Sequence, residues 1–234
     1  MRRRSWPAAL AAAVLLLLVV ACGGLQPEDP GLALRQGGQA TGTLKTVDAT
    51  MKVTKGTISF QGFSLVSANA ALRLPDESDT TYLVRQQDLQ LGLEVVILGG
   101  HVYLKPPLLR FTELSPGDAA DIPDLARLFD PVHGLPAVIP AGSNPQYEKV
   151  ESINGVDCHK VSAIYTAAQI SGLLPQLASQ SDVTADIWVG GSDHYIRKAV
   201  LGGNFGDNGT LSVVEVDLSN FDGSVNIASP GRTS

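Results

Sequence analysis

Apolar and polar residues alternate along most of this chain, and short clusters of Gly, Asn and Asp interrupt the alternation. The stretches 47–53, 64–74 and 89–97 each place apolar residues at every second position. Because successive side chains of a strand point to opposite faces of a sheet, this pattern predicts strands with one covered and one solvated face. Such strands are typical of antiparallel sheets that pack one face against a core.

Turn signals divide the rest of the chain into further strands. Asn154-Gly155 stands between two apolar stretches, and both residues tolerate the positive φ that a type I′ hairpin turn requires. Gly99-Gly100 and Gly191-Ser192-Asp193 are also turn signals, and Asp207-Asn208-Gly209 leads into a last strand at 211–218. We therefore expect about eight antiparallel strands in meander order.

Three segments have features of helices. Asp121 to Phe129 is expected to form a short helix with Asp121 as its cap and Pro123 in its first turn. Thr166-Ala167-Ala168-Gln169 has the pattern of a capping box and precedes apolar residues at helical spacing, namely Ile170, Leu173, Leu174 and Leu177, with Pro175 ending or kinking the helix. A weaker helix is expected near 32–44, where Gly37-Gly38 lowers the helix propensity. Together the segments predict an α+β fold, a large curved antiparallel sheet with helices on its concave side.

The N-terminus has the three parts of a secretory signal. Arg2, Arg3 and Arg4 are followed by an uncharged apolar run of 13 residues, 8–20, and by the small residue Ala21. The run is shorter than the roughly 20 residues that a membrane-spanning helix needs. Residues 1–21 are therefore predicted to be a signal peptide that is removed.

Val19-Val20-Ala21-Cys22 resembles a lipobox, the recognition sequence of lipoprotein processing. The resemblance implies cleavage between Ala21 and Cys22, a diacylglycerol thioether on Cys22, acyl chains such as palmitate, and in many lipoproteins an N-acyl group as well. Two or three acyl chains anchor a protein stably. We expect a chain anchored on the outer face of the plasma membrane, with a flexible tether at 22–31, a single domain at 32–229 and a tail at 230–234.

Charge and cysteine content exclude several classes of protein. Without the three N-terminal arginines the chain has 14 basic and 23 acidic residues, a net charge of −9. An acidic surface repels phosphate backbones, which argues against a nucleic-acid partner. Once Cys22 is acylated, Cys158 is the one remaining thiol, so no internal disulfide can form, and a buried inert cysteine on a strand is the simplest interpretation.

Catalytic signatures are missing from the sequence. It contains no G-x-S-x-G, P-loop, H-E-x-x-H or G-x-G-x-x-G motif. Cys158 and His159 are adjacent, and neighbours on a strand project to opposite faces, so they are not expected to pair. The remaining candidates are histidines without metal-ligand spacing (His101, His133, His194) and aspartates that a solvated, capped helix face explains, with a cation site as the alternative (Asp118, Asp121, Asp124, Asp130). We expect no enzyme, no metal and no cofactor beyond the lipid on Cys22.

The order of these segments resembles the actinobacterial LppX/LprG family of envelope lipoproteins, whose half-barrel sheet is related to the carrier LolA. The matching stretches are Gly100-His101-Val102-Tyr103, Asp130-Pro131-Val132-His133-Gly134-Leu135, Ile153-Asn154-Gly155, Ala185-Asp186-Ile187-Trp188-Val189 and His194-Tyr195-Ile196-Arg197-Lys198-Ala199. The weak first helix departs from the family pattern. The resemblance implies a hydrophobic cavity between sheet and helices that accepts acylated glycolipids or phospholipids and carries them in the cell envelope, without naming a transporter partner.

The candidate lining of that cavity consists of large aliphatic and aromatic residues on the predicted inner faces. They are Met51, Val53, Leu72, Leu74, Leu91, Leu93, Val95, Leu128, Phe129, Leu135, Ile170, Leu173, Leu174, Ile187 and Val200. Plain core packing is the alternative for each of them, because alternation identifies a buried face without showing whether a void lies against it. The alternative function is an envelope interaction or sensor module with the same fold and no lipid cargo. In either case we expect a monomer.

Overall fold

The computed structural model describes residues 24–60, 62–173, 179–205 and 210–230. The predicted signal peptide, Cys22, Leu174 and the turn at 207–209 lie outside these ranges. Among the described residues, no helix has the length and apolar character needed to cross a bilayer.

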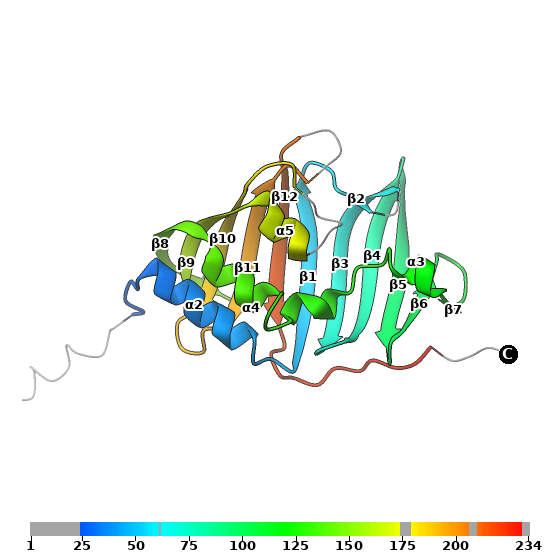
Figure 1. The fold of residues 1–234 in the computed structure, drawn as a ribbon, viewed down its shortest axis with the longest axis horizontal. Helices are drawn as coiled ribbons and strands as arrows, with labels where there is room; N and C mark the ends of the chain where they lie inside the picture. The colour runs from blue at the N-terminus through cyan, green and yellow to red at the C-terminus, as the bar shows by residue number, and fades with distance from the viewer. Residues whose placement is uncertain (1–23, 61, 174–178, 206–209, 231–234) are drawn as a thin grey trace, which may run out of the picture.

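An open antiparallel sheet forms most of the molecule (Figure 1). Its strands are β1 (Thr46–Lys55), β2 (Ser59–Phe60), β3 (Phe63–Arg73), β4 (Glu77–Gln86), β5 (Leu89–Leu98), β6 (His101–Lys105), β7 (Thr112–Glu113), β8 (Ser143–Ile153), β9 (Val156–Tyr165), β10 (Val183–Gly190), β11 (Ile196–Gly203) and β12 (Ser212–Ser219). Eleven strands follow the order β7-β6-β5-β4-β3-β1-β12-β11-β10-β9-β8, and β2 pairs only with β3. The antiparallel sheet is confirmed, but the expected number of about eight strands is wrong.

The sequence pattern did not reveal the long strand β4 or the two-residue strands β2 and β7, which explains the low count. In β4 the residues on the buried face include Ser78 and Thr80 beside Tyr82 and Val84, so polar residues occupy both faces. Strand β8 is the last in the sheet, pairs only with β9 and exposes most of its residues. The Asn154-Gly155 turn between β8 and β9 is confirmed, since both residues have positive φ, 51° and 81°.

The strand order is not a single meander as expected. One meander runs from β3 to β7 and another from β8 to β12, and β1 lies between β3 and β12. Met51 of β1 is opposite Val216 of β12, and Ala49 is opposite Leu218. The first and last long strands of the domain therefore form the centre of the sheet.

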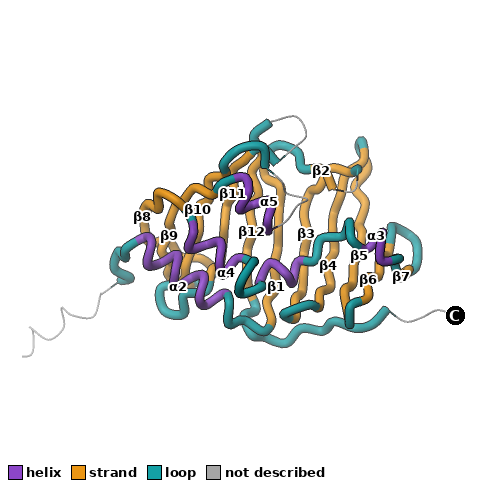
Figure 2. Tube along the Cα trace, viewed as in Figure 1, coloured by secondary structure: helices purple, strands orange, loops and turns teal. Residues whose placement is uncertain are grey.

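The helices lie on one face of the sheet (Figures 1 and 2). They are α2 (Pro30–Thr41), α3 (Pro116–Ala119), the 3-10 helix η1 (Leu125–Phe129), α4 (Leu135–Val138), the 3-10 helix η2 (Ile139–Ala141) and α5 (Ala167–Leu173). The expected helix at 121–129 is wrong in part, because only 125–129 are helical. Its cap is Asp124, whose carboxylate accepts a hydrogen bond from the Ala126 amide.

Helix α2 is a regular helix of 12 residues, although Gly37-Gly38 makes it weak in the sequence. Asp29 caps it by accepting a hydrogen bond from the Leu32 amide at 2.7 Å, and Pro30 occupies its first turn. A Cβ atom on Gly38 would lie 2.7 Å from Cγ of Pro140 and 2.8 Å from the Pro136 carbonyl oxygen. The glycines therefore allow close contact with neighbouring elements, and this packing offsets their cost of about 1 kcal/mol each in a helix.

The capping box before α5 is confirmed. The Thr166 amide donates to the side-chain oxygen of Gln169 at 2.8 Å, and the Gln169 amide donates to the Thr166 hydroxyl at 3.3 Å. These two bonds satisfy donors at the helix start that have no partner within the helix. The capping box fixes the first turn of α5 above the sheet.

Candidate functional site

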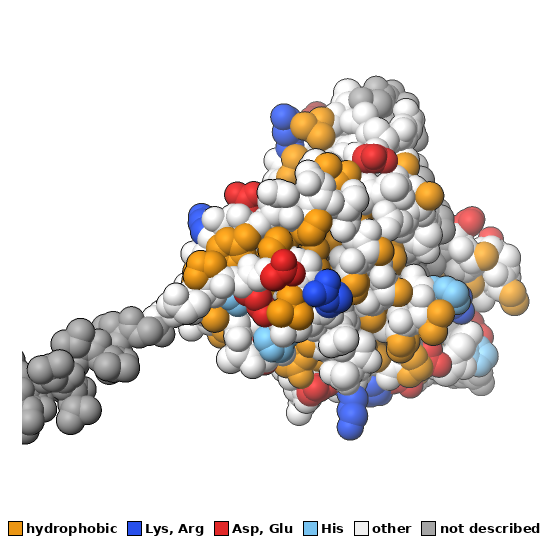
Figure 3. Space-filling model, turned by 60° about the vertical axis from the view of Figure 1, so that its left-hand side comes forward, with side chains coloured by type: hydrophobic (Ala, Val, Ile, Leu, Met, Phe, Trp, Pro, Cys, Tyr) orange, Lys and Arg blue, Asp and Glu red, His pale blue; other side chains and the backbone are white. Residues whose placement is uncertain are grey.

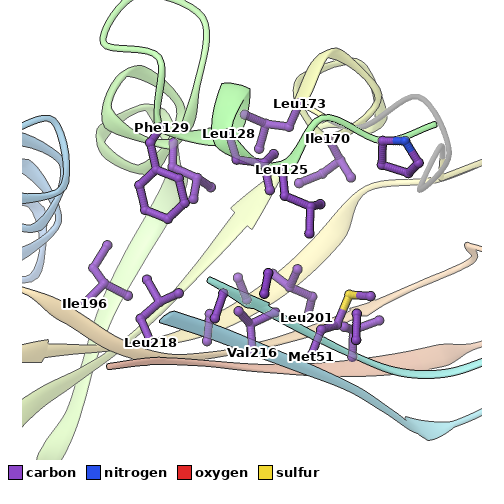
Figure 4. A pocket seen from close by; sticks show the side chains of 18 of the residues that line it. Met51, Leu125, Leu128, Phe129, Ile170, Leu173, Ile196, Leu201, Val216 and Leu218 are labelled. Carbon is purple, nitrogen blue, oxygen red and sulfur yellow. The ribbon is translucent and has the colours of Figure 1, made fainter. Parts of the chain in front are cut away.

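A cavity of about 190 Å³ lies between the sheet and the helices (Figure 4). Its floor is the inner face of five central strands: Ala49, Met51, Leu65, Ala68, Ala70, Leu72, Ala185, Ile187, Ile196, Ala199, Leu201, Val214, Val216 and Leu218. Its roof comes from four short helices: Leu125, Leu128, Phe129, Leu135, Val138, Ile139, Ile170 and Leu173. Since one buried water needs roughly 10–15 Å³ of such space, the cavity holds roughly a dozen groups of the size of a water or a methylene.

The floor is only half-buried over the centre of the sheet. Met51, Leu201 and Val216 face inward, yet each keeps part of its surface accessible. Five floor residues are alanines, which fill little of the space below the roof: Ala49, Ala68, Ala70, Ala185 and Ala199. Ordinary cores are packed at the density of organic crystals. Short side chains opposite a roof of leucines therefore leave a void instead of a filled core.

The described lining contains no Asp, Glu, Lys, Arg or His. Its polar members include Thr41 and Tyr165, whose hydroxyls are used within the protein. The Thr41 hydroxyl donates to the Gly37 carbonyl at 2.7 Å, and the Tyr165 hydroxyl donates to the Ile139 carbonyl at 2.9 Å. Burial raises the pKa of Tyr165, which keeps this phenol neutral. The cavity thus has the chemistry of a hydrocarbon solvent and suits an alkyl chain.

Eight of the predicted residues line this cavity, from both floor and roof: Met51, Leu72, Leu128, Phe129, Leu135, Ile170, Leu173 and Ile187. Figure 4 shows Met51 on the sheet, opposite Leu125, Leu128 and Leu173 on the helices. The structure therefore brings together residues from both halves of the chain. Whether lipid occupies this space stays a prediction.

Three predicted residues line no described cavity. Val200 is wrong because β11 carries a β-bulge at Arg197: Trp188 pairs with Lys198, whereas Val189 pairs with Ile196. The bulge shifts the alternation, so Ile196, Ala199 and Leu201 face the cavity and Val200 faces outward. Val53 and Leu74 line neither cavity; both are partly buried and pack against the core.

Leu91, Leu93 and Val95 are inward-facing, but they line a second hollow at the other end of the sheet. It has a volume of about 400 Å³ and is bordered by α3 and the segment before η1, with two exposed carboxylates, Asp118 and Asp121. A carboxylate near an alkyl chain has to stay hydrated, which makes this hollow a poorer site for apolar ligands than the cavity. Leu174 lies outside the described residues.

The sequence reasoning missed the alanines of the floor and the apolar residues of β12. The alternation at 212–218 places Val214, Val216 and Leu218 on one face, and this signal could have identified them as lining. The alanines were overlooked because only large side chains were considered as lining. A small residue on an inner face is the signal that could have revealed space opposite it.

Cys158 and His159 are both buried, at 0% and 3% exposure. Burial raises the pKa of the Cys158 thiol, so the thiol stays protonated and unreactive, in line with the inert cysteine expected from the sequence. The described residues contain no cluster of three or more His, Cys, Asp or Glu side chains arranged to hold a metal ion. Asp130 accepts hydrogen bonds from the Val132 and His133 amides, which lower its pKa and mark it as a turn-stabilising residue.

Comparison with known proteins places this arrangement in a family. The family model described as LppX_LprAFG lipoprotein matches residues 29–227, which include every described strand and helix. This chain belongs to the LppX_LprAFG lipoprotein family. The resemblance inferred from the order of segments is therefore confirmed, and the weak first helix is present as α2.

Curated relatives of the chain are named "Lipoarabinomannan carrier protein LprG". The protein from Mycolicibacterium smegmatis is 28% identical over 51% of this chain and 52% of the relative. The protein from Mycobacterium leprae is 24% identical over 77% of this chain and 68% of the relative. This chain thus spans about half the length of the Mycolicibacterium smegmatis relative.

Two solved structures share the fold at low sequence identity. LprF from Mycobacterium bovis has a TM-score of 0.69 at 20% identity, covering 88% of this chain and 99% of that chain. LppX from Mycobacterium tuberculosis has a TM-score of 0.61 at 20% identity, covering 86% and 100%. A LolA-superfamily protein from Nitrosomonas europaea reaches a TM-score of only 0.29, so the expected relation to LolA stays a prediction.

Proposed function

We propose that this chain is a membrane-anchored lipoprotein that binds acylated lipids in the cavity between sheet and helices and carries them within the cell envelope. The observation that carries the proposal is the uncharged void between the alanine-rich floor and the leucine-rich roof. A carrier role is also supported by the relatives named as lipoarabinomannan carriers. No catalytic residue is part of the proposal.

The energetics suit reversible transport. Moving one methylene from water into an apolar site gains about 0.8 kcal/mol, so an acyl chain exposed to water is held strongly. The same chain gains little when it leaves a bilayer, because it is already in an apolar environment. A cavity about as apolar as lipid can therefore load from one membrane and unload into another.

The cargo is proposed to be a glycolipid or phospholipid with its headgroup outside. The described cavity offers no charged side chain to a headgroup, and only Ser59 of its lining is exposed. Burying a charged or hydroxyl-rich headgroup without partners would cost several kcal/mol. The protein would thus recognise the acyl part and tolerate different headgroups.

The anchor is proposed to be Cys22, acylated and held on the outer face of the plasma membrane. The proposal rests on the lipobox-like sequence at 19–22 and on the lipoprotein family to which the chain belongs. An anchor keeps the cavity near the bilayer that supplies its cargo. A test is mass spectrometry of the N-terminal peptide from membranes, in which Cys22→Ser should abolish the acyl mass.

Lipid loading can be tested by native mass spectrometry of the mature chain purified without detergent. We expect co-purified lipid that acylated competitors displace. Recovery of a lipid-free protein that also fails to take up any acylated ligand would sink the proposal.

An interaction or sensor module is the second candidate. One observation favours it: Leu108 and Leu109, between β6 and β7, are 104% and 63% exposed. Exposed apolar residues of this kind mark contact sites on some proteins. Replacing both leucines with Ser should leave lipid loading unchanged under the carrier proposal, whereas a module of the second kind would bind no lipid before or after the change.

A further inference from the structure

The residues before α2 are packed against the domain, although the sequence predicts a flexible tether there. Leu25 lies over Gly191, in the turn between β10 and β11. A Cβ atom on Gly191 would lie 2.4 Å and 2.5 Å from the two Cδ atoms of Leu25. The Gly191 amide donates to the Asp157 carbonyl at 2.9 Å, which fixes the turn beneath Leu25. Only a residue without a side chain leaves room for this contact.

Glu28 holds the same segment at a second point. Its Oε2 atom lies 3.4 Å from Nε2 of His159, whose side chain is 4% exposed. Tyr147 packs edge-on against the His159 ring, with 6.0 Å between ring centroids, and His194 is the other titratable group near His159. The Nδ1 atoms of both histidines are buried without a hydrogen-bond partner. The carboxylate of Glu28 is thus the acceptor that the described residues offer to His159.

The far end of the segment is fixed by α2. Asp29 caps this helix, and Ala33 and Leu34 of its first turns are 0% and 1% exposed. The helix begins at Pro30, so the boundary expected at residue 32 is too late. Residues 25–29 are therefore held by Gly191, by His159 and by the start of a buried helix.

We infer that residues 25–29 form a docked strap, so that only Gly23 and Gly24 separate the acylated Cys22 from the folded domain and the β10–β11 turn faces the bilayer that holds the anchor. The inference rests on the acylation of Cys22 under the proposed function. Three residue steps of extended chain reach at most about 11 Å. The domain would therefore sit on the membrane surface. The expectation of a flexible tether along 22–31 is wrong for residues 25–31, because 25–29 are docked and Pro30 and Gly31 belong to α2.

The surface around the turn is compatible with a bilayer. The carboxylate of Asp193 is paired with Arg197 through Oδ1 at 2.9 Å and Oδ2 at 2.6 Å, so its charge is compensated. The strap lies at the β8–β9 end of the sheet (Figure 1), and the part of the surface shown in Figure 3 mixes hydrophobic, acidic and basic side chains. The anchor and the strap, not a basic patch, would thus set the orientation.

The orientation can be measured on the full acylated chain in phosphatidylcholine vesicles that contain lipids with a spin-labelled headgroup. Ser192→Cys and Asp88→Cys each add one exposed thiol, at the β10–β11 turn and at the distant β4–β5 turn, for a fluorescent label. Cys158 is buried and Cys22 is acylated, so neither competes for the label. We expect several-fold stronger quenching at position 192 than at position 88. Equal quenching at the two positions would overturn the inference, and so would a chain that fails to float with the vesicles.

Two further variants test separately the length of the free chain after the anchor and the docking of the strap. Six Gly and Ser residues inserted between Gly24 and Leu25 should lower quenching at position 192 several-fold, because they lengthen the free part of the chain. Leu25→Ser with Glu28→Gln should lower it as well by releasing the strap, while Gly92→Ala, where a Cβ meets no atom within 4 Å, should not. No response to either change would contradict the docked strap. Lipid co-purification, which tests the proposed carrier function, is measured separately and can fail while the orientation holds.

Discussion

Met51 of β1 and Val216 of β12 are direct partners across the centre of the sheet, although they lie 165 positions apart, and both face the cavity. Their pairing joins the two meanders of the sheet. The floor of the cavity thus depends on strands from both ends of the domain, and a ligand there would contact both halves of the chain. This arrangement makes the cavity sensitive to single residues on the central strands.

Ala199→Trp should abolish most lipid loading, because an indole at this position fills space above the sheet. Val200→Trp is the matched control, since Val200 follows directly in β11 and faces outward between Asp186 and Glu215. The measurement is native mass spectrometry of both variants after purification without detergent. Equal loss of lipid in both variants would mean that the cavity is not where lipid binds.

Gly38→Ala should destabilise the protein by about 1–3 kcal/mol, because its Cβ would meet Pro140 and the Pro136 carbonyl at less than 3.0 Å. The gain in helix propensity of about 1 kcal/mol does not offset such overpacking. Gly172→Ala in α5 is the control, since a Cβ there meets nothing within 4 Å and should stabilise by about 0.5–1 kcal/mol. Urea unfolding of the two variants checks both signs.

Stability should fall as the pH falls below about 6.5, the ordinary pKa of histidine. Burial has the largest effect on the pKa of His159 and lowers it. The charge of Glu28 raises this pKa, and His194 lowers it further. Because the folded pKa is depressed, the unfolded chain binds more protons in this pH range, and protonation favours unfolding. Urea midpoints at pH 7.5 and 5.0 should differ less in His159→Phe and more in Glu28→Gln than in the parent chain. An unchanged pH dependence in His159→Phe would refute this role of His159.

The thiol of Cys158 should resist alkylation in the folded protein. Its side chain is fully buried, and burial raises its pKa, so little thiolate forms near pH 8. Ser192→Cys provides an exposed thiol in the same fold as a positive control. Mass spectrometry after iodoacetamide treatment at pH 8 should show one rapid modification in the variant and none in the parent chain; rapid modification of Cys158 itself would disprove its burial.

Thr166→Ala should destabilise α5 by about 0.5–2 kcal/mol through loss of the capping box. The effect on lipid loading should be larger than the effect on global stability, because Ile170 and Leu173 of this helix form part of the roof. Thr166→Ser retains the hydroxyl and serves as the control. A Thr166→Ala protein with unchanged lipid loading and unchanged unfolding would show that the capping box does not hold the roof.

Local patterns in the sequence determined most of the long strands, the hairpin turn at Asn154-Gly155 and the capping box at Thr166, since each depends on residues a few positions apart. Tertiary structure decided the rest. The bulge at Arg197 reverses which residues of β11 face inward, so Val200 was assigned to the wrong side. Gly37 and Gly38 look unfavourable for a helix until their close contacts are known, those of Gly37 with Val189 and Ile196 and those of Gly38 with Pro136 and Pro140.

The cavity itself shows this division most clearly. Alternation assigned Met51, Leu72 and Ile187 to an inner face, and these residues do line the cavity. Whether a void lies against that face depends on the alanines of neighbouring strands and on the distance between the sheet and helices that are far away in the sequence. Likewise, Gly23 to Gly31 has the composition of a free tether, but the contacts of Leu25 with Gly191 and of Glu28 with His159 hold part of it on the domain. Periodicity encodes which side of a strand is covered, whereas the space beside it is set by long-range packing.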